Sequence, residues 1–302
     1  MSDAHTIVVT GASSGIGAAA VRLFHEAGHQ VVVVGRDPQR TAAVADALDC
    51  APRYICDFTR LDDVRRLAAQ LQAHHPRIDV LANNSGGMFD GFAVTADGFE
   101  RTLQVNHLAP ALLTRLLARN LVEAGGRVVW TSSMSIRMQK QVKVDWLAAV
   151  PLAPAAQPTV ADLHPLVRNS QAASGTFHPL ARYAQAKLAM THVAVEMNRR
   201  YSDRGLASVA FHPGVIASNF GSGTDTFIGR AYRGRLVKAL FTSPTTAAQR
   251  LARLALGTPG VDFQPGTYVQ GRGAKSFPGS DDASVAQQVW DRTENLLATI
   301  VD

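Results

Sequence analysis

The chain has 302 residues, of which 46% are hydrophobic and 18% charged, a balance that is ordinary for a soluble globular protein. No uninterrupted apolar run approaches the ~20 residues that span a bilayer, and the first six residues lack the basic-then-apolar pattern of a targeting signal. The net charge of +6 comes mostly from scattered arginines without interleaved aromatic residues, which argues against a nucleic-acid partner. We therefore expect a cytoplasmic protein without a transmembrane segment.

A glycine turn joins the first expected strand to the first expected helix. Ile7, Val8 and Val9 lead into glycines at 11, 15 and 17, and residues 18–26 have a helical pattern. Glycine allows the backbone to approach a phosphate closely, while unpaired N–H groups and the positive helix end face the anion. The turn is therefore a candidate pyrophosphate site. Its G-x-x-x-G-x-G spacing taken alone is also compatible with an ordinary turn.

Strands and helices alternate along the first half of the chain. Short apolar runs, typical of strands buried on both faces, are separated by segments with helical periodicity. The expected strands are residues 31–34, 54–56, 79–82 and 127–130, and the expected helices are residues 41–48, 61–74 and 98–122. This alternation predicts an α/β fold of the Rossmann type, with a doubly wound parallel sheet, helices on both faces and ligands at the carboxyl ends of the strands.

The second half begins with a segment that interrupts this alternation. Prolines at 151, 154, 158, 165 and 179 prevent a long element between residues 135 and 179, so we interpret this segment as an insertion and residues 1–302 as a single domain. Helices are then expected at residues 181–200, 244–256 and 283–297, and strands at residues 207–211 and 266–270, the latter being the last strand. Ser243 and Pro244 are a suitable cap and first-turn pair for the helix at 244–256. Cys50 and Cys56 lack metal-type companions, so we expect reduced packing residues and no metal site.

Tyr183 and Lys187 are four residues apart on an expected helix and so lie on one face of it. A phenol has a pKa of about 10, and a nearby ammonium group favours the phenolate and lowers that pKa. The pair is a candidate proton-transfer unit, although taken alone it also fits a packing tyrosine and a solvated lysine.

Six motifs, in the same order along the chain, resemble those of the short-chain dehydrogenase/reductase family. They are residues 10–17, Asn83-Asn84-Ser85-Gly86, Asn106, Thr131-Ser132-Ser133, Tyr183-Ala184-Gln185-Ala186-Lys187 and Pro213-Gly214. Segments 97–100, 105–108, 212–215 and 289–290 are most similar to the retinol-dehydrogenase and protochlorophyllide-reductase-like branch. Ser85 and Ser218 stand where the family usually has alanine and threonine.

The resemblance implies a role for each catalytic residue. Tyr183 acts as general acid in carbonyl reduction and as base in alcohol oxidation, and Lys187 holds the nicotinamide ribose and lowers the pKa of the tyrosine. Ser133, rather than its neighbour Ser132, orients the substrate oxygen, and Asn106 binds a water in a proton relay. These donors are needed where alkoxide charge develops as hydride leaves the nicotinamide.

The end of the second strand indicates which nicotinamide dinucleotide binds. An acidic residue there accepts from the ribose 2′-hydroxyl, whereas arginine pairs with a 2′-phosphate. Because Arg36 follows Gly35, with Asp37 one place later, we expect NADP(H) rather than NAD(H), with Arg36 as the phosphate partner and Arg40 as support; the alternative is that Arg36 is a solvated turn residue. The resemblance places the other cofactor contacts at Gly11, Ser13, Ser14, Gly15, Ile16, Gly17, Asp57, Phe58, Asn83, Ser85, Gly86, Tyr183, Lys187, Pro213, Gly214, Ile216 and Ser218.

The distance from Ser133 to Tyr183 is longer than the family norm. Residues 135–179 emerge next to the expected active site, so we interpret them as a pocket wall or lid, the alternatives being a surface decoration or an interface. Residues 219–241 correspond to the family's substrate-binding region and are expected to be a lid, although their basic face also fits a membrane surface.

Together these features predict NADPH-dependent reduction of a ketone or aldehyde on a bulky, largely apolar small molecule of the kind found in secondary metabolism. Two alternatives stay open: reduction of an activated C=C bond, and a non-catalytic protein that senses NADP. The resemblance also implies a homodimer or homotetramer formed through the helices at 98–122 and 181–200, unless the insertion blocks that surface.

Overall fold

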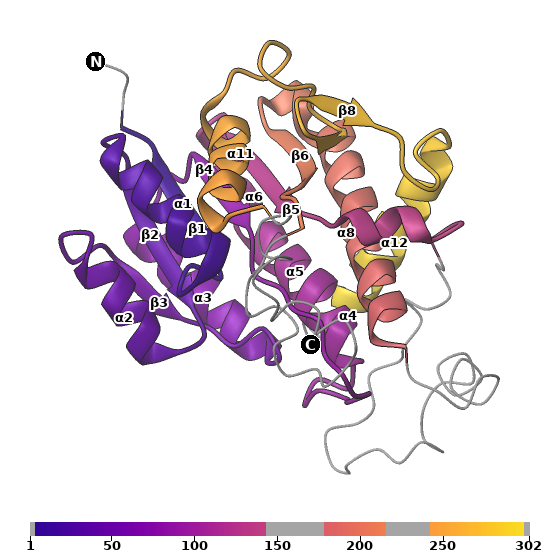
Figure 1. The fold of residues 1–302 in the computed structure, drawn as a ribbon, viewed down its shortest axis with the longest axis horizontal. Coiled ribbons are helices and arrows are strands. Elements are labelled where there is room, and N and C mark those ends of the chain that lie inside the picture. The colour runs from indigo at the N-terminus through magenta and orange to yellow at the C-terminus, as the bar shows by residue number, and fades with distance from the viewer. Residues whose placement is uncertain (1–3, 143–177, 216–241, 299–302) are drawn as a thin grey trace.

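The computed structural model describes residues 4–142, 178–215 and 242–298 (Figure 1). These residues form an eight-stranded sheet in the order β3-β2-β1-β4-β5-β6-β7-β8, in which every neighbouring pair is parallel except β7 and β8. The strands are β1 (Thr6–Thr10), β2 (Gln30–Gly35), β3 (Arg53–Ile55), β4 (Val80–Asn83), β5 (Arg127–Thr131), β6 (Ala207–His212), β7 (Tyr268–Gln270) and β8 (Gly273–Lys275). The predicted doubly wound α/β fold is confirmed.

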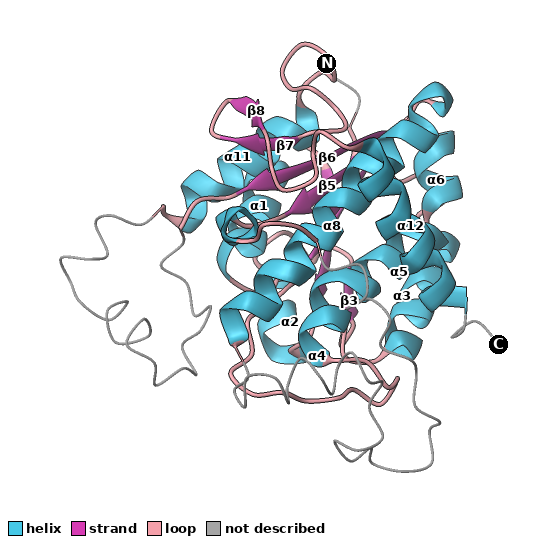
Figure 2. Ribbon diagram, turned by 90° about the vertical axis from the view of Figure 1, so that its right-hand side faces the viewer, coloured by secondary structure: helices cyan, strands magenta, loops and turns pink. Residues whose placement is uncertain are grey.

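Helices cover both faces of this sheet. They are α1 (Gly15–Glu26), α2 (Pro38–Asp46), α3 (Leu61–His74), α4 (Arg101–Leu103), a π-helical turn (Gln104–Leu108), α5 (Ala109–Leu116), α6 (Ala118–Glu123), α8 (Pro179–Tyr201), α11 (Pro244–Leu256) and α12 (Ala283–Ala298), with short 3₁₀ turns at Met134–Met138 and Ser202–Arg204. Figure 2 shows α1 and α11 on one side of the sheet and α3, α5 and α8 on the other.

The two faces have separate hydrophobic cores. Val8 and Val32 pack with α3, α5, α8 and α12, whereas Ile7, Val9 and Val33 pack with α1, α2 and α11. Successive strand residues point to opposite faces, so a strand covered on both sides must be apolar at every position. This explains the uninterrupted runs of β-branched residues in the first two strands.

The helix expected over residues 98–122 is wrong as a single element. The chain begins a helix only at Arg101, widens into the π-helical turn, resumes as α5 and breaks again at Leu117 before α6. In the wide turn the Asn106 side-chain amide donates to Thr102 O at 2.9 Å, so a side chain satisfies a carbonyl four residues earlier. Periodicity does not distinguish such a turn from α-helix, because the buried positions on either side remain in helical order.

The strand expected at residues 266–270 is not the last strand. Tyr268–Gln270 is followed by a tight hairpin and by β8, in which Gln270 pairs with Gly273. Gly271 has φ 69°, a left-handed conformation that glycine adopts without strain. The exposed residues of β8 give no apolar signal, which is why the sequence did not indicate this edge strand.

Helix α12 packs along α8 and also reaches α5. Asp291 Oδ1 lies 3.2 Å from Arg200 Nη2 of α8, and Glu294 Oε2 lies 3.5 Å from Arg115 Nε of α5. Part of the surface expected to join subunits is therefore covered by the chain's own C-terminal helix, and any association through α5 and α8 has to include α12.

Two predicted segments, the insertion and the lid region, are largely or wholly beyond the part of the chain that the structure describes. Most of the insertion at 135–179 and all of the lid region at 219–241 lie outside the described residues, and the assignment of 1–302 to one domain stays a prediction.

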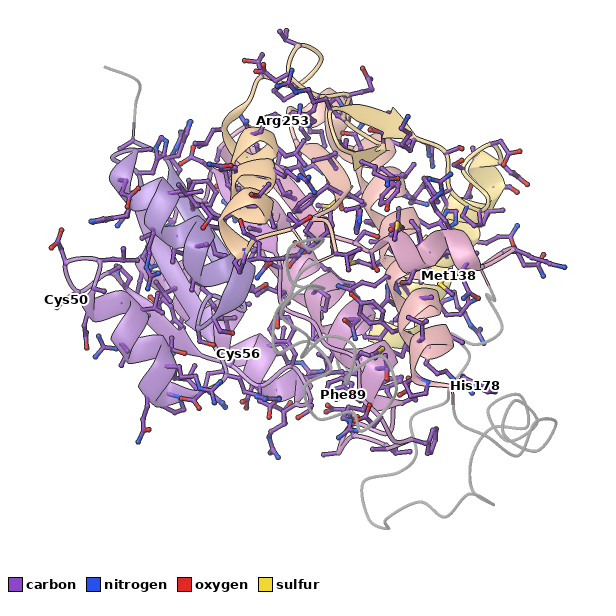
Figure 3. The ribbon with its side chains drawn as sticks, in the orientation of Figure 1. Cys50, Cys56, Phe89, Met138, His178 and Arg253 are labelled. Atoms are coloured by element: carbon purple, nitrogen blue, oxygen red, sulfur yellow. The ribbon has the colours of Figure 1, made fainter. Side chains whose placement is uncertain are left out.

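Cys56 is buried as expected, but Cys50 is exposed at the periphery (Figure 3), so the packing role predicted for it is wrong. Within the described ranges, no helix has both the length and the apolar character of a membrane span.

Candidate active site

The turn between β1 and α1 is shaped by close backbone contacts that only glycine permits. Gly11 has φ 66°, and a Cβ there would lie 2.9 Å from the Cα of Ser85. A Cβ on Gly17 would overlap the carbonyl oxygen of Gly11 and approach Ala12 Cα to 2.8 Å. The turn therefore packs directly against the end of β4 and leads into the N-terminus of α1 at the cavity.

A cavity of about 840 Å³ lies at the carboxyl ends of β1, β2 and β4. It brings together ten of the predicted cofactor residues, namely Gly11, Ser13, Ser14, Gly15, Ile16, Arg36, Asp57, Phe58, Ser85 and Gly86. The sequence also indicated two of its other lining residues, Arg40 and, within the motif 83–86, Asn84. The full set of other lining residues is Asp37, Pro38, Arg40, Cys56, Thr59, Asn84, Gly87, Met88, Phe89, Val105 and Pro244. Its position is where ligands of doubly wound sheets bind.

Asn83 does not face this cavity. Its side chain is 1% exposed, and Nδ2 donates to Thr114 Oγ1 at 2.8 Å in the helix layer. The neighbouring Asn84 lines the cavity instead, and its Nδ2 donates to Thr10 O at 2.9 Å. Consecutive residues at a strand end point to opposite sides, so within the motif 83–86 the side chain that lines the cavity is that of Asn84 and not that of Asn83.

Arg36 and Asp37, which follow β2, differ in their side-chain contacts. The Asp37 carboxylate caps α2 by accepting from Arg40 N at 2.9 Å, and Arg40 Nε lies 3.6 Å from it. Arg36 is exposed at the cavity and forms no ion pair or side-chain hydrogen bond with the described part of the chain. The acidic group is thus engaged with α2 and Arg40, while the Arg36 guanidinium is available to a ligand.

Helix α8 and the end of β5 bring the proton-transfer residues together. Tyr183 and Lys187 lie in α8 and are 6% and 2% exposed. The Tyr183 hydroxyl is hydrogen-bonded to the side chain of Ser133, which follows β5. Lys187 Nζ donates to Thr131 O at 2.8 Å and lies 5.8 Å from the centre of the Tyr183 ring. The sequence pattern predicted this pair, and α8 places both side chains against the end of β5.

The two serines at this strand end have different partners. Ser132 is buried, and its hydroxyl bonds Thr191 Oγ1 at 2.8 Å inside α8. Ser133 bonds Tyr183 and also accepts from Ser135 Oγ at 2.9 Å. The structure therefore places Ser133, not Ser132, beside the tyrosine.

Asn106 anchors the loop that follows β4. Its Oδ1 accepts from Gly87 N at 3.1 Å, and its Nδ2 donates to Gly87 O at 2.8 Å. A Cβ on Gly86 would lie 2.6 Å from Asn106 Oδ1 and 3.0 Å from Lys187 Nζ. Asn106 and Lys187 thus converge on Gly86, which joins the cavity to the proton-transfer residues. Because both donors of the Asn106 amide are engaged by carbonyls, its side chain acts first as an anchor.

The pKa shifts of the tyrosine and lysine have one main cause. Burial raises the pKa of Tyr183, outweighing the lowering by its hydrogen bond with Ser133, and burial lowers the pKa of Lys187 to about 7. The expected lowering of the tyrosine pKa by the ammonium is not found in the protein alone. Low polarity disfavours the charged form of both groups, so Tyr183 is a protonated phenol at neutral pH and is ready to donate.

The remaining predicted residues are spread around this core. Gly214, with φ 108°, and Pro213 follow β6, where Arg250 Nη1 donates to Pro213 O at 2.8 Å. Gly17, Asn83, Tyr183, Lys187, Pro213 and Gly214 are not among the residues that line the cavity. Ile216 and Ser218 lie outside the described residues.

Tyr268 is a site neighbour that sequence reasoning missed. It lies in β7, fully buried, and its hydroxyl donates to Ser133 O at 3.2 Å. It therefore fixes the backbone of the serine that contacts Tyr183. No motif marks it, because its position depends on β7 pairing with β6.

The residues fit a nicotinamide dinucleotide. The cavity has the size of small-molecule and cofactor sites, and its floor is a glycine turn at a helix N-terminus, a kind of site that binds phosphate. Within the described residues, Arg36 at the end of β2 forms no ion pair or side-chain hydrogen bond. Gly86 provides the close approach between this cavity and the tyrosine–lysine pair.

Comparisons with known proteins agree with this geometry. A family model described as short chain dehydrogenase matches residues 5–148. A protein of Streptomyces sp. (strain C5), provisionally named daunorubicin C-13 ketoreductase, is 36% identical over 95% of this chain and 90% of its own length. Human retinol dehydrogenase 13 is 29% identical over 97% of this chain and 84% of its own length.

Solved structures share the fold. An uncharacterized protein from Mycobacterium Paratuberculosis superposes with a TM-score of 0.66 at 26% identity, covering 97% of this chain and 93% of that one. A short-chain dehydrogenase/reductase from Caenorhabditis elegans, crystallised with cofactor, gives a TM-score of 0.65 at 19% identity over 94% and 97% of the two chains. The sheet, the glycine turn and these likenesses lead to one conclusion: the chain is an oxidoreductase of the short-chain dehydrogenase/reductase family, in its retinol-dehydrogenase-like branch, which uses a nicotinamide cofactor.

Proposed function

We propose that this protein reduces a ketone or aldehyde on a bulky, largely apolar small molecule to the alcohol, with NADPH as reductant. The observation that carries this proposal is the pairing of a protonated, buried Tyr183 with Ser133, beside Lys187 and at the end of the dinucleotide-sized cavity. A ketoreductase name among relatives more than 30% identical supports the ketone class.

The proton path follows from the hydrogen bonds. Ser135 Oγ donates to Ser133 Oγ, and Ser133 in turn bonds the Tyr183 hydroxyl. A carbonyl oxygen placed between Ser133 and Tyr183 receives one hydrogen bond from the serine and the proton from the phenol. When bound, the cofactor supplies the hydride to the carbonyl carbon. Because these donors are fixed by the fold, they stabilise the developing alkoxide without reorganisation.

Lys187 and Asn106 complete the site. Lys187, held at Thr131 O, lies where it can hold the nicotinamide ribose and place positive charge near the phenolate that forms. Asn106 holds Gly87 by two hydrogen bonds and thereby fixes the wall that separates the cavity from α8. The water-binding role expected for Asn106 stays part of the proposal.

Two features support the choice of cofactor and substrate. Arg36, the residue expected to pair with the 2′-phosphate, has no partner within the described residues, whereas Asp37 caps α2. Met134, which follows Ser133, and Met138 in the same 3₁₀ turn are exposed, and Figure 3 shows Met138 at the surface. Methionine adapts to irregular apolar ligands.

The two alternatives predict different products. Reduction of an activated C=C bond would give a saturated carbonyl compound rather than an alcohol. A sensor that only binds NADP would not need the buried tyrosine–lysine pair, which this chain retains.

The test is consumption of NADPH and of NADH with a panel of hydrophobic ketones, aldehydes and quinones, followed by product analysis. We expect alcohol formation with NADPH, and a loss of about 10²–10⁴-fold in kcat in Tyr183→Phe with unchanged NADPH affinity. Tight NADPH binding without turnover would favour the sensor, and a faster rate with NADH would contradict the role of Arg36.

A further inference from the structure

The π-helical turn Gln104–Leu108 contacts a different partner with each polar side chain. Gln104 Nε2 donates to Asp97 Oδ2 at 2.7 Å, Asn106 holds Gly87, and His107 points toward α12. Val105 lines the cofactor cavity. The position of Asn106 therefore depends on contacts made on several sides of the same turn.

His107 is joined to α12 by a buried hydrogen bond. It is 0% exposed, and its Nε2 lies 2.8 Å from Thr293 Oγ1, which itself donates to Val289 O at 2.7 Å. A hydroxyl has only one proton, and here Val289 O receives it. His107 must therefore donate from Nε2, which leaves its Nδ1 as a buried acceptor without a partner in the described part of the chain.

This histidine is a fixed link rather than a titrating group. Burial lowers the pKa of His107 to about 3, so the ring is neutral throughout the physiological range. Because one tautomer satisfies Thr293, the orientation of the ring and hence of the turn is set by the position of α12.

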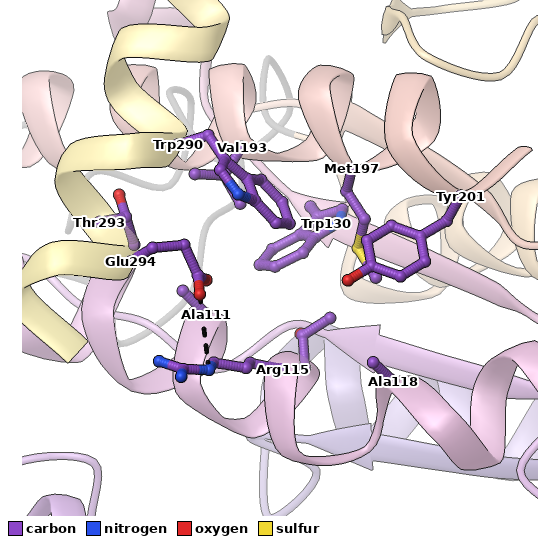
Figure 4. A pocket seen from close by; sticks show the side chains of 11 residues that line it. Ala111, Arg115, Ala118, Trp130, Val193, Met197, Tyr201, Trp290, Thr293 and Glu294 are labelled. Carbon is purple, nitrogen blue, oxygen red and sulfur yellow. Dashed lines mark ion pairs between the residues drawn. The ribbon is translucent and has the colours of Figure 1, made fainter. Parts of the chain in front are cut away.

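Next to this link α12 also packs along α8, where the Arg200 guanidinium lies 5.1 Å from the centre of the Trp290 ring. A pocket of about 120 Å³ lies between α12, α8 and α5 and is lined by Trp130, Met197, Tyr201 and Trp290 among others (Figure 4). At its rim Glu294 pairs with Arg115 at 3.5 Å, and Thr293 also lines it (Figure 4). This volume is far below that of a typical ligand site of about 300–1,000 Å³. Next to the pocket, the buried bond between Thr293 and His107 joins α12 directly to the π turn.

We propose that His107, oriented by Thr293 of the C-terminal helix, is a positioning residue that fixes the π turn and so holds Asn106 against Gly87. The helix that covers α5 and α8 is then also part of the active-site framework. The catalytic consequence rests on the proposed reductase function, whereas the effect on Gly87 does not.

The experiment compares Thr293→Val, which keeps the shape but removes the hydroxyl, with Thr293→Ser, which keeps the hydroxyl. Asp291→Asn is the matched control, since Asp291 contacts Arg200 from the same helix and does not touch His107. Three quantities are measured in each: the tautomer of His107 by ¹⁵N NMR, hydrogen exchange of the Gly87 amide, and kcat and KM of the full chain with NADPH.

We expect Thr293→Val to lose the Nε2–H tautomer signal of His107, to speed exchange at Gly87 about 10-fold, and to lower kcat about 10-fold with little change in KM for NADPH. In Thr293→Ser and in Asp291→Asn, the His107 tautomer, the exchange rate at Gly87 and kcat should all resemble those of the native protein. A Thr293→Val protein with altered His107 but native exchange at Gly87 and native kcat would overturn the proposal and leave only a structural bond. If the native chain shows no turnover, the reductase proposal fails. Hydrogen exchange at Gly87 still decides whether His107 fixes the π turn.

Discussion

The two ends of the active site are built in different ways. The cofactor end consists of backbone from a few neighbouring segments, held close because glycines at 11 and 17 remove side chains from the contact. The proton-transfer end consists of side chains from β5, the π turn, α8 and β7, with hydrogen bonds that link Thr131, Ser133, Tyr268 and Lys187. A local motif can specify the first arrangement, but the second depends on how distant elements pack.

The two ends meet at Gly86, and substitution there should impair both of them at once. In Gly86→Ala the new methyl group would lie 2.6 Å from Asn106 Oδ1 and 3.0 Å from Lys187 Nζ, so both have to move. We expect kcat/KM to fall about 100-fold. Gly87→Ala is the control, because the nearest neighbour of its methyl group among the described residues would be the Phe89 ring, at an ordinary contact distance of 3.6 Å. Equal activity in the two variants would show that the ends are not coupled at this residue.

The next largest effect tests the cofactor end alone. Arg36→Ala should weaken NADPH binding about 30-fold and leave NADH binding nearly unchanged, because only NADPH carries the 2′-phosphate. Arg40→Ala should have a smaller effect, since Arg40 lies 3.6 Å from Asp37. Titration calorimetry with both dinucleotides measures this. A parallel loss for NADH would mean that Arg36 supports the fold of the turn rather than the phosphate.

A third prediction concerns burial at the proton-transfer end. The pKa of Lys187 falls from 10.5 to about 7 on folding, so between these values the unfolded chain binds more protons and the free energy of unfolding rises with pH. The slope for this one group is at most ~1.4 kcal/mol per pH unit. Urea unfolding between pH of about 7 and about 8 measures it, because the thiol of Cys56, whose pKa burial raises in the folded protein, titrates in the unfolded chain with its ordinary pKa of 9.0. Lys187→Met should flatten the rise, and an unchanged slope would assign it to other groups.

The smallest effect separates two adjacent asparagines. Asn83→Ala should lower the free energy of unfolding by about 1 kcal/mol through the lost bond to Thr114, without changing dinucleotide affinity. Asn84→Ala, which loses the bond to Thr10 O beside the glycine turn, should weaken dinucleotide binding about 5-fold. Calorimetry and denaturation on both proteins provide the comparison. The reverse result would assign the contact with the dinucleotide to the side chain of Asn83.

Sequence periodicity predicted most elements closely, including α3 over Leu61–His74, because both faces of each parallel strand are buried and each helix has one apolar face. It did not indicate β8 or the division of residues 98–122. The first is an exposed edge strand, and the second results from a side-chain amide that replaces a backbone donor.

The sequence by itself determined the glycine turn, the tyrosine–lysine pair and the arginine after β2, since each is set by spacing within a few residues of one element. Only the tertiary structure decided that the side chain of Asn84 rather than that of Asn83 faces the cavity, and that Tyr268 supports the serine. Ser133, the serine indicated by the family resemblance, is the one that contacts Tyr183 in the structure. Burial reversed the expected shift in the pKa of Tyr183, because removing water from the phenolate outweighs the hydrogen bond from Ser133. Desolvation depends on every element packed around a group, and spacing along the chain does not contain that information.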